Sequence, residues 1–487
     1  MAKKISYILL TIVLLLLLSN IWSLYVLQKN VKTYINLNLS NSSDEQLMEK
    51  TVKKITKNYK KINKNLKKIV FKDFSDDLPI ILTHFLNEKN NSYLIVLQNS
   101  DELRASGGFM GSYFFLEFSR GMWNIGSIQD IYTIAGQQTN FPASPPGHYE
   151  YLSEGKGFLI QDANWWPDVA TSATTILKLR QEIAQTSHYI DQNYEIAGVI
   201  FVNLDFIENL LAQIGPIQLS DYDQAISAEN FAEIARASRT DFFAGSKEKA
   251  NFLNHSKVAI TNKLTQLSSQ EQWQLLKLIN DNLINKNIQI FSQNQEIQAI
   301  WQKHDFAGQL QKKNPQSFYF FSVESNVGIN KANRLIDREF HFYRQDQEIT
   351  QIMIKFLNHN QVPQSINDNP DLKTANHLTY VNYQRLYFSP EVKIKQIQTI
   401  DAQQEKNELE FTSQPYFNQS GQEFLEVSFL LAVPEQEQLE VVIDLENADI
   451  HQDLEIQKQS GIKQIPIFLY QDQELISNWT LTSDQLE

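Results

Sequence analysis

The chain has 487 residues, no cysteine and a formal net charge of −13. Because cysteine is absent, disulfides, zinc–thiolate sites and cysteine nucleophiles are excluded. Residues 1–72 carry 14 of the 43 basic residues but only three of the 56 acidic ones, so residues 73–487 have a charge of −24. Such an acidic body lacks the clustered basic side chains that bind phosphodiester backbones, and nucleic acid is not an expected partner.

Residues 5–27 form an almost continuous apolar run without a charged side chain. About 20 such residues suffice to cross a bilayer as a helix. No small-x-small cleavage site ends the run, which favours an uncleaved anchor over a signal peptide. Lys3 and Lys4 precede it, and long domains are translocated largely regardless of their charge. We therefore expect a single-pass protein of the cell membrane, with residues 1–4 as a cytoplasmic tip and the body outside.

Residues 28–72 are rich in lysine and predict a helical stalk. Their apolar side chains recur at alternating spacings of four and three, as in a coiled coil. These side chains are Met48, Val52, Ile55, Tyr59, Ile62, Leu66 and Ile69. The helix could join copies of the chain into a homo-oligomer, lie on an anionic membrane surface, or pack on the following domain. The sequence leaves these three interpretations open.

Residues 73–335 predict an α/β domain, with a mixed sheet and flanking helices, because strand-like and helix-like apolar patterns follow one another. The strand-like runs are 93–98, 112–118, 123–128, 196–202 and 317–323. The helix-like runs are 171–184, 204–214, 228–237, 247–267 and 270–282.

Residues 336–487 predict a separate β-rich domain, because apolar residues alternate there in place of the helical spacing. The clearest strands are 338–344, 348–358, 424–433, 439–446 and 465–471. Several short alternating strands are typical of a sandwich. The polar segment 358–376 contains two prolines and predicts a loop.

The first candidate site follows the strand 93–98, where Asn99, Glu102 and Arg104 precede a glycine-rich turn. Folds of the α/β class build sites from polar residues at the ends of apolar strands. The planar guanidinium of Arg104 is suited to an anionic group such as a phosphate. The alternative is an ion pair between Arg104 and a nearby carboxylate that fixes the loop.

The second candidate lies in the segment 161–173, QDANWWPDVATSA. Asp162 and Asp168 could hold Mg²⁺ together with retained waters, with Asn164 between them. Alternatively, Asp168 caps the helix that begins near Thr171.

The third candidate is the segment 235–252, which combines basic and acidic side chains in a short span. Arg236 and Arg239 could neutralise a diphosphate, and Asp241 could hold its metal ion. Solvated helix ends have a similar composition. The sequence contains no HExxH and no GxSxG, so zinc hydrolysis and nucleophile-elbow chemistry are not expected.

Several motifs resemble the bacterial family known as domain of unknown function 4012, and together they span most of residues 90–470. They are QNSDELRASGGFMGSY (98–113), DANWWPD (162–168), IAGVIFVNLDFIENLLAQIGPIQL (196–219), VESNVGINKAN (323–333), NYQRLYFSPEVKI (382–394) and IQKQSGIKQIP (456–466). The resemblance implies a single-pass protein whose body lies outside the cytoplasm. The family has no assigned activity.

A weaker resemblance is to the LytR-CpsA-Psr transferases, which move glycopolymers from a polyprenyl-diphosphate carrier to the cell wall. Arg104 with its following hairpin, the segment 196–217 and the run RASRTDFF (236–243) are similar to motifs of that family. One departure is the turn SIQDI (127–131), where the transferases have SIPRD. Gln129 therefore replaces an arginine that grips phosphate.

These resemblances imply an envelope protein that binds or transfers a lipid-linked glycopolymer on a polyprenyl diphosphate. The arginines of the first and third candidate sites would clamp phosphates, and the aspartates of the second and third would hold Mg²⁺. The alternative is a non-catalytic envelope protein that binds a glycan or assembles through its stalk and β-rich domain. The two differ in whether the candidate sites share one pocket.

Overall fold

The computed structural model describes residues 29–30, 33, 45–61, 77, 80–81, 84, 91–119, 122–153, 155, 157–190, 194–237, 247–345, 348–361, 378–446 and 453–486. The predicted anchor, residues 5–27, and most of the predicted loop 358–376 lie outside these ranges. Among the helices that the structure describes, none is both long and apolar enough to span a membrane.

From the predicted stalk the structure describes mainly helix α2, Glu45–Lys61. Ile55, one of the apolar heptad positions, is buried. The lysines on the other side are exposed, namely Lys50, Lys53, Lys54 and Lys57. This burial agrees with the interpretation in which the helix packs by its apolar side.

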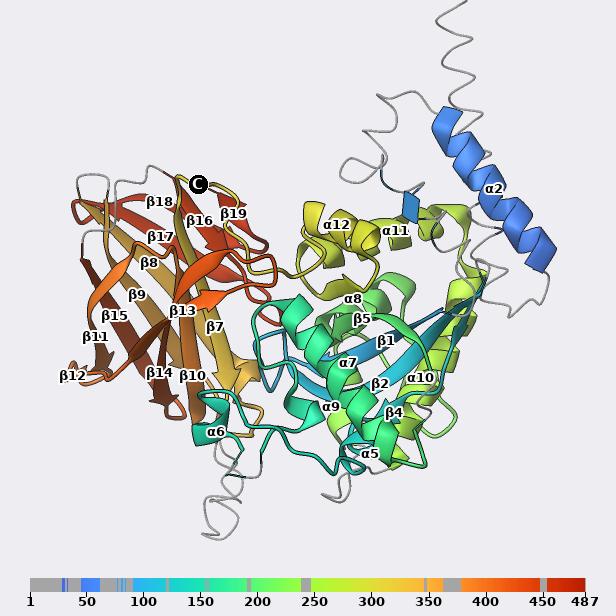
Figure 1. The fold of residues 1–487 in the computed structure, drawn as a ribbon, viewed down its shortest axis with the longest axis horizontal. Helices are drawn as coiled ribbons and strands as arrows, with labels where there is room; N and C mark the ends of the chain where they lie inside the picture. The colour runs from blue at the N-terminus through green and yellow to red at the C-terminus, as the bar shows by residue number, and fades with distance from the viewer. Residues whose placement is uncertain are drawn as a thin grey trace, which may run out of the picture.

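The α/β part is built on one mixed sheet with the order β3-β2-β1-β5-β6, in which the short β4 pairs with β2 (Figure 1). β1 and β5 are parallel, whereas β2 and β6 run antiparallel to them. The strands are β1 Asn91–Asn99, β2 Phe109–Ser119, β3 Met122–Ile125, β4 Gln129–Asp130, β5 Ile196–Asn203 and β6 Ile288–Ser292. The helices are α5 Tyr132–Ala135, α6 His148–Tyr151, η1 Ile160–Asp162, α7 Val169–Thr186, α8 Leu204–Ile214, α9 Phe231–Ala237, α10 Lys247–Gln266, α11 Ser269–Ile284 and α12 Gln295–Lys303.

Both faces of this sheet are apolar. Successive side chains of a strand point to opposite faces, so Leu94 and Val96 of β1 pack with α7 residues such as Ile176. Tyr93 and Ile95 pack on the other face with Val202 of β5. A strand covered on both faces reads as a continuous apolar run, which is the pattern of residues 93–97.

The β-rich part consists of two sheets, with the orders β13-β14-β10-β7-β16-β19 and β12-β11-β15-β9-β8-β17-β18. The strands of the first are β7 Phe318–Asn326, β10 Tyr380–Phe388, β13 Thr412–Phe417, β14 Glu423–Val433, β16 Leu454–Gln457 and β19 Gln485–Leu486. Those of the second are β8 Ile336–Gln345, β9 Glu348–Asn358, β11 Lys393–Asp401, β12 Lys406–Glu408, β15 Gln438–Glu446, β17 Ile465–Gln471 and β18 Glu474–Leu481. The turn η2, Ala332–Leu335, joins β7 to β8.

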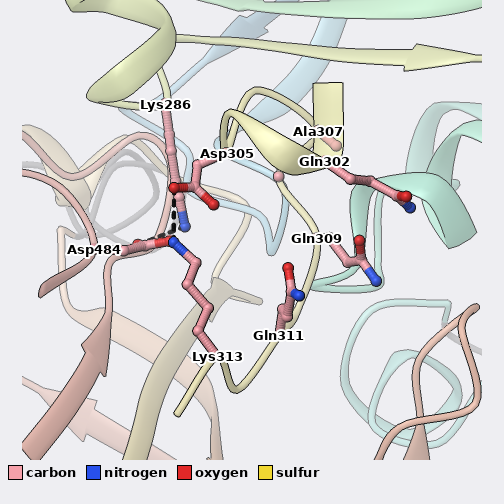
Figure 2. Close-up of a pocket in the computed structure, with 9 residues that line it drawn as sticks. Lys286, Gln302, Asp305, Ala307, Gln309, Gln311, Lys313 and Asp484 are labelled. Carbon is pink, nitrogen blue, oxygen red and sulfur yellow. Dashed lines mark ion pairs between the residues drawn. The ribbon is translucent and has the colours of Figure 1, made fainter. Parts of the chain in front are cut away.

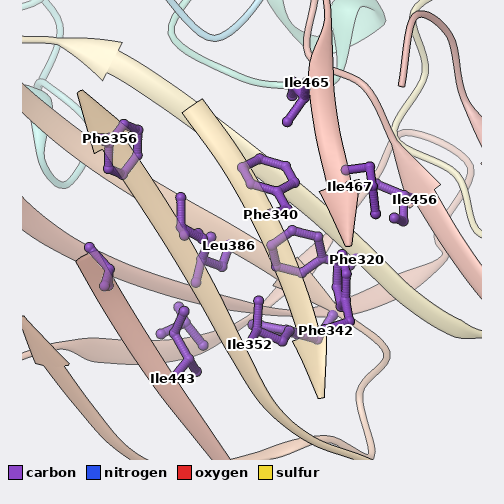
Figure 3. Packing of buried hydrophobic residues seen from close by; sticks show 14 of the residues in the cluster. Phe320, Phe340, Phe342, Ile352, Phe356, Leu386, Ile443, Ile456, Ile465 and Ile467 are labelled. Atoms are coloured by element: carbon purple, nitrogen blue, oxygen red, sulfur yellow. The ribbon is translucent and has the colours of Figure 1, made fainter. Parts of the chain in front are cut away.

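The two sheets of the β-rich part share one hydrophobic core. Phe320 and Leu386 of the first sheet meet Phe340 and Ile352 of the second (Figure 3). On its opposite face the first sheet carries Tyr319 and Phe321, which cluster with Ala105 and Leu310 from outside the β-rich strands. The first sheet is therefore sandwiched between the second sheet and the α/β part.

The expected fold class is confirmed in outline, since α/β elements come first and a β-rich part follows. The position of β7 differs from the expectation. Residues 317–323 were assigned to an α/β domain ending at 335, whereas β7 pairs with β10 and β16 of the β-rich part. Every residue of β7 is buried, so the strand shows no alternation that could link it to the β-rich pattern.

Candidate functional site

A cavity of about 960 Å³ lies between one face of the α/β sheet and helices α8 to α11. Its wall is mostly apolar. The sheet contributes Ile95, Leu97, Phe114 and Val202, and the helices contribute Leu204, Phe206, Ile207, Leu210, Phe231, Leu253, Ile260, Leu264, Leu275, Leu276 and Ile279. The face of β1 opposite α7 is thus only partly covered by side chains, and the remaining space can receive an apolar ligand.

Charged side chains also line this cavity. The cations are Arg104, Lys249, Lys257 and Lys331, and the anions are Asp101, Glu102 and Asp162. Lys257 donates to the carbonyl oxygen of Gly126 at 2.7 Å, and burial lowers the pKa of its ammonium group. Lys249 places its Nζ beside Gly111, where an added Cβ would lie 2.9 Å away. The excess of cations contrasts with the acidic body of the chain.

Arg104 borders the cavity, but its guanidinium group binds neighbouring protein groups. Its side chain is 2% exposed and forms an ion pair with Glu102 at 2.9 Å. Its Nη1 donates to the carbonyl oxygen of Asn326 at 2.5 Å and to that of Leu103 at 3.2 Å. The alternative expectation, an arginine–carboxylate pair that fixes the loop, is confirmed by this contact. Asn99 likewise supports the turn, because its Oδ1 accepts from the backbone of Asp101.

The second candidate site is divided between two roles. Asp162 lines the cavity and lies 3.4 Å from Nε2 of His148. Asp168 is the N-cap of α7 and accepts from the backbone N–H of Thr171 at 3.0 Å, so the capping interpretation is confirmed. Burial raises the pKa of the Asp168 carboxyl group. Asn164 is buried and donates to the carbonyl oxygen of Gly108.

The third candidate site is only partly described. Arg236 lies in α9, whose Phe231, Ala232 and Ala235 line the cavity. Arg239 and Asp241 lie outside the described residues. The described ranges contain no group of three or more histidine, cysteine, aspartate or glutamate side chains that could hold a metal ion. The structure thus brings Glu102, Arg104, Asn99 and Asp162 to one cavity, together with the helix that carries Arg236, but Asn164 and Asp168 are absent from its lining.

Gln129, which replaces the arginine of the transferase turn, is exposed on β4 and accepts from the hydroxyl of Tyr113 at 2.6 Å. It is absent from the cavity lining.

Three of the sequence motifs meet where the two parts join. The carbonyl oxygen of Leu103 accepts from the N–H of Asn326, and the N–H of Leu103 donates to Oδ1 of Asn333. Gln459 Nε2 donates to the carbonyl oxygens of Arg104 and Glu324. These residues belong to the motifs 98–113, 323–333 and 456–466 and are mostly buried. We call this set of contacts the interface.

The two chain segments at the interface approach so closely that only glycine fits. A Cβ on Gly107 would lie 2.5 Å from Oγ of Ser460, and a Cβ on Gly461 would overlap the carbonyl oxygen of Gly107. Both glycines have positive φ angles, 129° and 83°, which disfavour other residues. Gly107 of the first motif therefore serves this contact, whereas Gly111 of the same motif lines the cavity.

A second contact joins the parts through Trp165 of the DANWWPD motif. Its ring stacks on Tyr383 of β10 at a centroid distance of 5.7 Å. Arg385 lies over the same indole at 4.8 Å and donates to the carbonyl oxygen of Trp165. This motif is thus also part of the structural junction.

A small polar pocket lies between the parts as well (Figure 2). Lys286 pairs with Asp484 at 2.7 Å, and Lys313 pairs with Asp305 at 2.7 Å. Its volume is about 10 Å³, which is room for roughly one water molecule. The charges of this pocket neutralise each other, and its small volume leaves no space for a larger ligand.

Residues 88–239 match the model of a family described as "Protein of unknown function (DUF4012)". Over this segment the chain is similar to that family. The resemblance predicted from the motifs is confirmed over the matched residues. No curated protein matches the sequence.

Two solved structures share a limited likeness with the chain. The Lin1025 protein from Listeria innocua is 11% identical, with a TM-score of 0.22, and the match covers 45% of this chain and 79% of that one. A transcriptional regulator from Enterococcus faecalis is 9% identical, also with a TM-score of 0.22, and the match covers 47% of this chain and 77% of that one. At this TM-score neither structure supports an argument about fold or function.

The DUF4012 segment supplies β1, β2, β5, α8 and α9 of the cavity, whereas α10 and α11 follow it in the sequence. Sequence reasoning missed the apolar wall because each of its residues also fits an ordinary core. One signal was present: β1 is apolar on both faces, so elements had to cover the face opposite α7.

Proposed function

We propose that this protein binds a lipid with a long hydrocarbon chain and an anionic phosphate or diphosphate head group. The observation that carries the proposal is the cavity of about 960 Å³ with its mostly apolar wall. This volume is near the upper end of the range of roughly 300–1,000 Å³ for ligand pockets. Transfer of hydrocarbon from water to such a wall contributes about 0.8 kcal/mol per buried CH₂.

The charges of the lining support an anionic head group. Arg104 is neutralised by Glu102, and Asp162 lies beside His148. In total the lining carries the cations Arg104, Lys249, Lys257 and Lys331 against the anions Asp101, Glu102 and Asp162. In a body with a net charge of −24 for residues 73–487, this local excess favours a phosphate.

The weaker resemblance to the LytR-CpsA-Psr transferases agrees with a polyprenyl-diphosphate carrier as the lipid. The arginine replaced by Gln129 and the candidate metal ligand Asp241 are the points on which transfer would depend. We therefore propose binding and assign no reaction. We also propose that residues 5–27 anchor the chain in the cell membrane with the body outside, where such carriers present their glycans.

The test is a titration of the purified full-length chain with geranylgeranyl phosphate in a non-ionic detergent. Leu253→Trp on α10 should fill the cavity and weaken binding at least tenfold, because the indole occupies the space of the hydrocarbon chain. Val258→Trp is the matched control, since Val258 lies on the same helix but is 55% exposed. Equal binding by both variants and the unaltered chain, or no binding by any of them, would contradict the proposal.

A further inference from the structure

The β-rich part contributes to the cavity through one loop. Val327–Lys331 follows β7, and Ile329 and Lys331 are the residues of the β-rich part that line the cavity. They share the lining with Glu102, Arg104 and Leu152 of the α/β part. Ile329 is 59% exposed, so the cavity opens to solvent at this end.

Ile329 has an unusual backbone conformation. Its φ angle is 51°, in the left-handed region, where a Cβ crowds the following carbonyl oxygen. The region is especially unfavourable for a β-branched side chain. Such strain persists only where the surrounding structure fixes the backbone, and it is concentrated at ligand-binding sites.

The backbone around Ile329 is fixed by asparagine side chains. Asn326 accepts from the N–H of Gly328 at 3.0 Å and donates to Asn330 at 3.1 Å. Asn330 accepts from the N–H of Ala332 at 3.1 Å and donates to the carbonyl oxygen of Thr379 at 2.8 Å. The carbonyl oxygen of Asn326 binds Arg104. The loop is therefore fixed by hydrogen bonds within the β-rich part, and the end of β7 that precedes it is bound to the α/β part through Arg104.

We propose that the loop Val327–Lys331 is a preorganised element of the binding site, so that the site is shared between the two parts. Ile329 packs on the hydrocarbon chain next to the head group, and Lys331 contacts the phosphate. A glycan attached to that phosphate would then leave the cavity beside the β-rich part. This inference rests on the proposed function and deepens it by naming the side of the cavity that binds the phosphate head group.

The role of Lys331 is tested with two probes that differ only in charge, geranylgeranyl phosphate and geranylgeraniol. Both are titrated against the full-length chain in the same non-ionic detergent. Lys331→Gln should weaken phosphate binding about fivefold and leave alcohol binding unchanged, because one partly exposed charge contact is lost. Lys393→Gln, at an exposed position of β11 outside the cavity lining, should change neither affinity.

The role of Ile329 is tested with Ile329→Asn. Asparagine tolerates the left-handed conformation, so the variant should unfold at the same temperature as the unaltered chain or higher. Its affinity for both probes should fall about fivefold, because an apolar contact with the hydrocarbon chain is replaced by a polar one.

The outcomes separate this inference from the proposed function. If Leu253→Trp abolishes binding while both loop variants bind like the unaltered chain, the loop proposal is overturned and the lipid site stands. If Lys331→Gln weakens the binding of both probes equally, Lys331 makes no specific contact with the phosphate, and this part of the proposal is overturned. If the unaltered chain binds neither probe, both proposals are overturned.

Discussion

The interface between the two parts is closely packed and mainly polar, whereas the cavity beside it is open space with a mostly apolar wall. At the interface, polar side chains and glycines from three sequence motifs are in direct contact, for example Gly107 with Gly461. The cavity is lined mostly by leucine, isoleucine and phenylalanine side chains, several of which come from the motif 196–219. Polar and glycine residues that suggested a ligand site in the sequence therefore join the two parts of the molecule. The space for a ligand is lined mainly by apolar residues that are typical of a hydrophobic core.

The largest effect is expected where the interface permits only glycine. Gly461→Ala should cost about 4 kcal/mol of the free energy of unfolding, because its Cβ would meet the backbone of Gly107. Gly421→Ala is the matched control, since Gly421 has nearly the same φ angle, 82°, and nothing within 4 Å of an added Cβ. The control should cost only about 1–2 kcal/mol of backbone strain. Urea unfolding of both variants measures the two losses in the free energy of unfolding. Equal losses would show that the close approach of Gly461 to Gly107 is unimportant for stability.

The next largest effect is expected at Arg104, which should contribute to stability, whereas the lysines of the cavity should contribute to lipid binding. Arg104→Ala should lower the free energy of unfolding by about 3 kcal/mol, because Glu102 and the carbonyl oxygen of Asn326 lose a buried partner. Arg104→Lys should restore little of the loss, since lysine lacks the planar fork. Lys249→Ala should instead weaken binding of geranylgeranyl phosphate with little change in stability. A stable Arg104→Ala variant that binds no lipid would reverse these roles.

The interface should also respond to pH through Lys458. Burial, with the neighbouring Lys286 ammonium group, lowers the pKa of Lys458 to about 7. Below that pH the folded and unfolded chains are both protonated at Lys458, and above it the unfolded chain binds more protons. The contribution of Lys458 to stability should therefore rise by about 2 kcal/mol between about pH 7 and about pH 9.

Lys458→Met removes this titration and should flatten the rise. Urea unfolding of the variant and the unaltered chain at both pH values gives the difference. An identical pH dependence of the two proteins would show that Lys458 is charged in the folded chain at both pH values.

The smallest effect is expected in the cavity wall. Leu276→Ala should cost about 1 kcal/mol without lipid, because Leu276 borders the cavity and we expect its truncation to remove fewer packing contacts than in a filled core. Leu386→Ala, in the core of the β-rich part, should cost about 3 kcal/mol. Thermal unfolding compares the two, and a cost at Leu276 as large as at Leu386 would mean that the wall is closely packed.

Much of the fold followed from the sequence because local patterns matched the tertiary structure. The strands 348–358 and 465–471 agree with β9 and β17 residue for residue, and 204–214 agrees with α8. β6 and α12 were not predicted, because β6 has only five residues and includes the polar Gln289. β7 was placed in the wrong part, since a strand buried on both faces carries no sign of its neighbours.

The candidate site was less predictable. The ion pair of Arg104 and the capping role of Asp168 were both foreseen as alternatives to a ligand site, because short sequence spacing is enough to suggest them. The interface was not foreseen, since Gly107 meets Gly461 only through the tertiary fold. A pocket shared by the candidate sites was expected, but its apolar wall was not, because Ile95 and Leu253 have the same pattern whether they pack on a neighbour or face a ligand.

Native mass spectrometry of the full-length chain, purified from the membranes of expressing cells, tests the central claim most directly. We predict one bound lipid per chain, with a phosphate in its head group, on the unaltered protein and on Val258→Trp. The lipid should be absent from Leu253→Trp. Equal occupancy of all three proteins, or a lipid-free unaltered chain, would contradict the assignment of the cavity as the functional site.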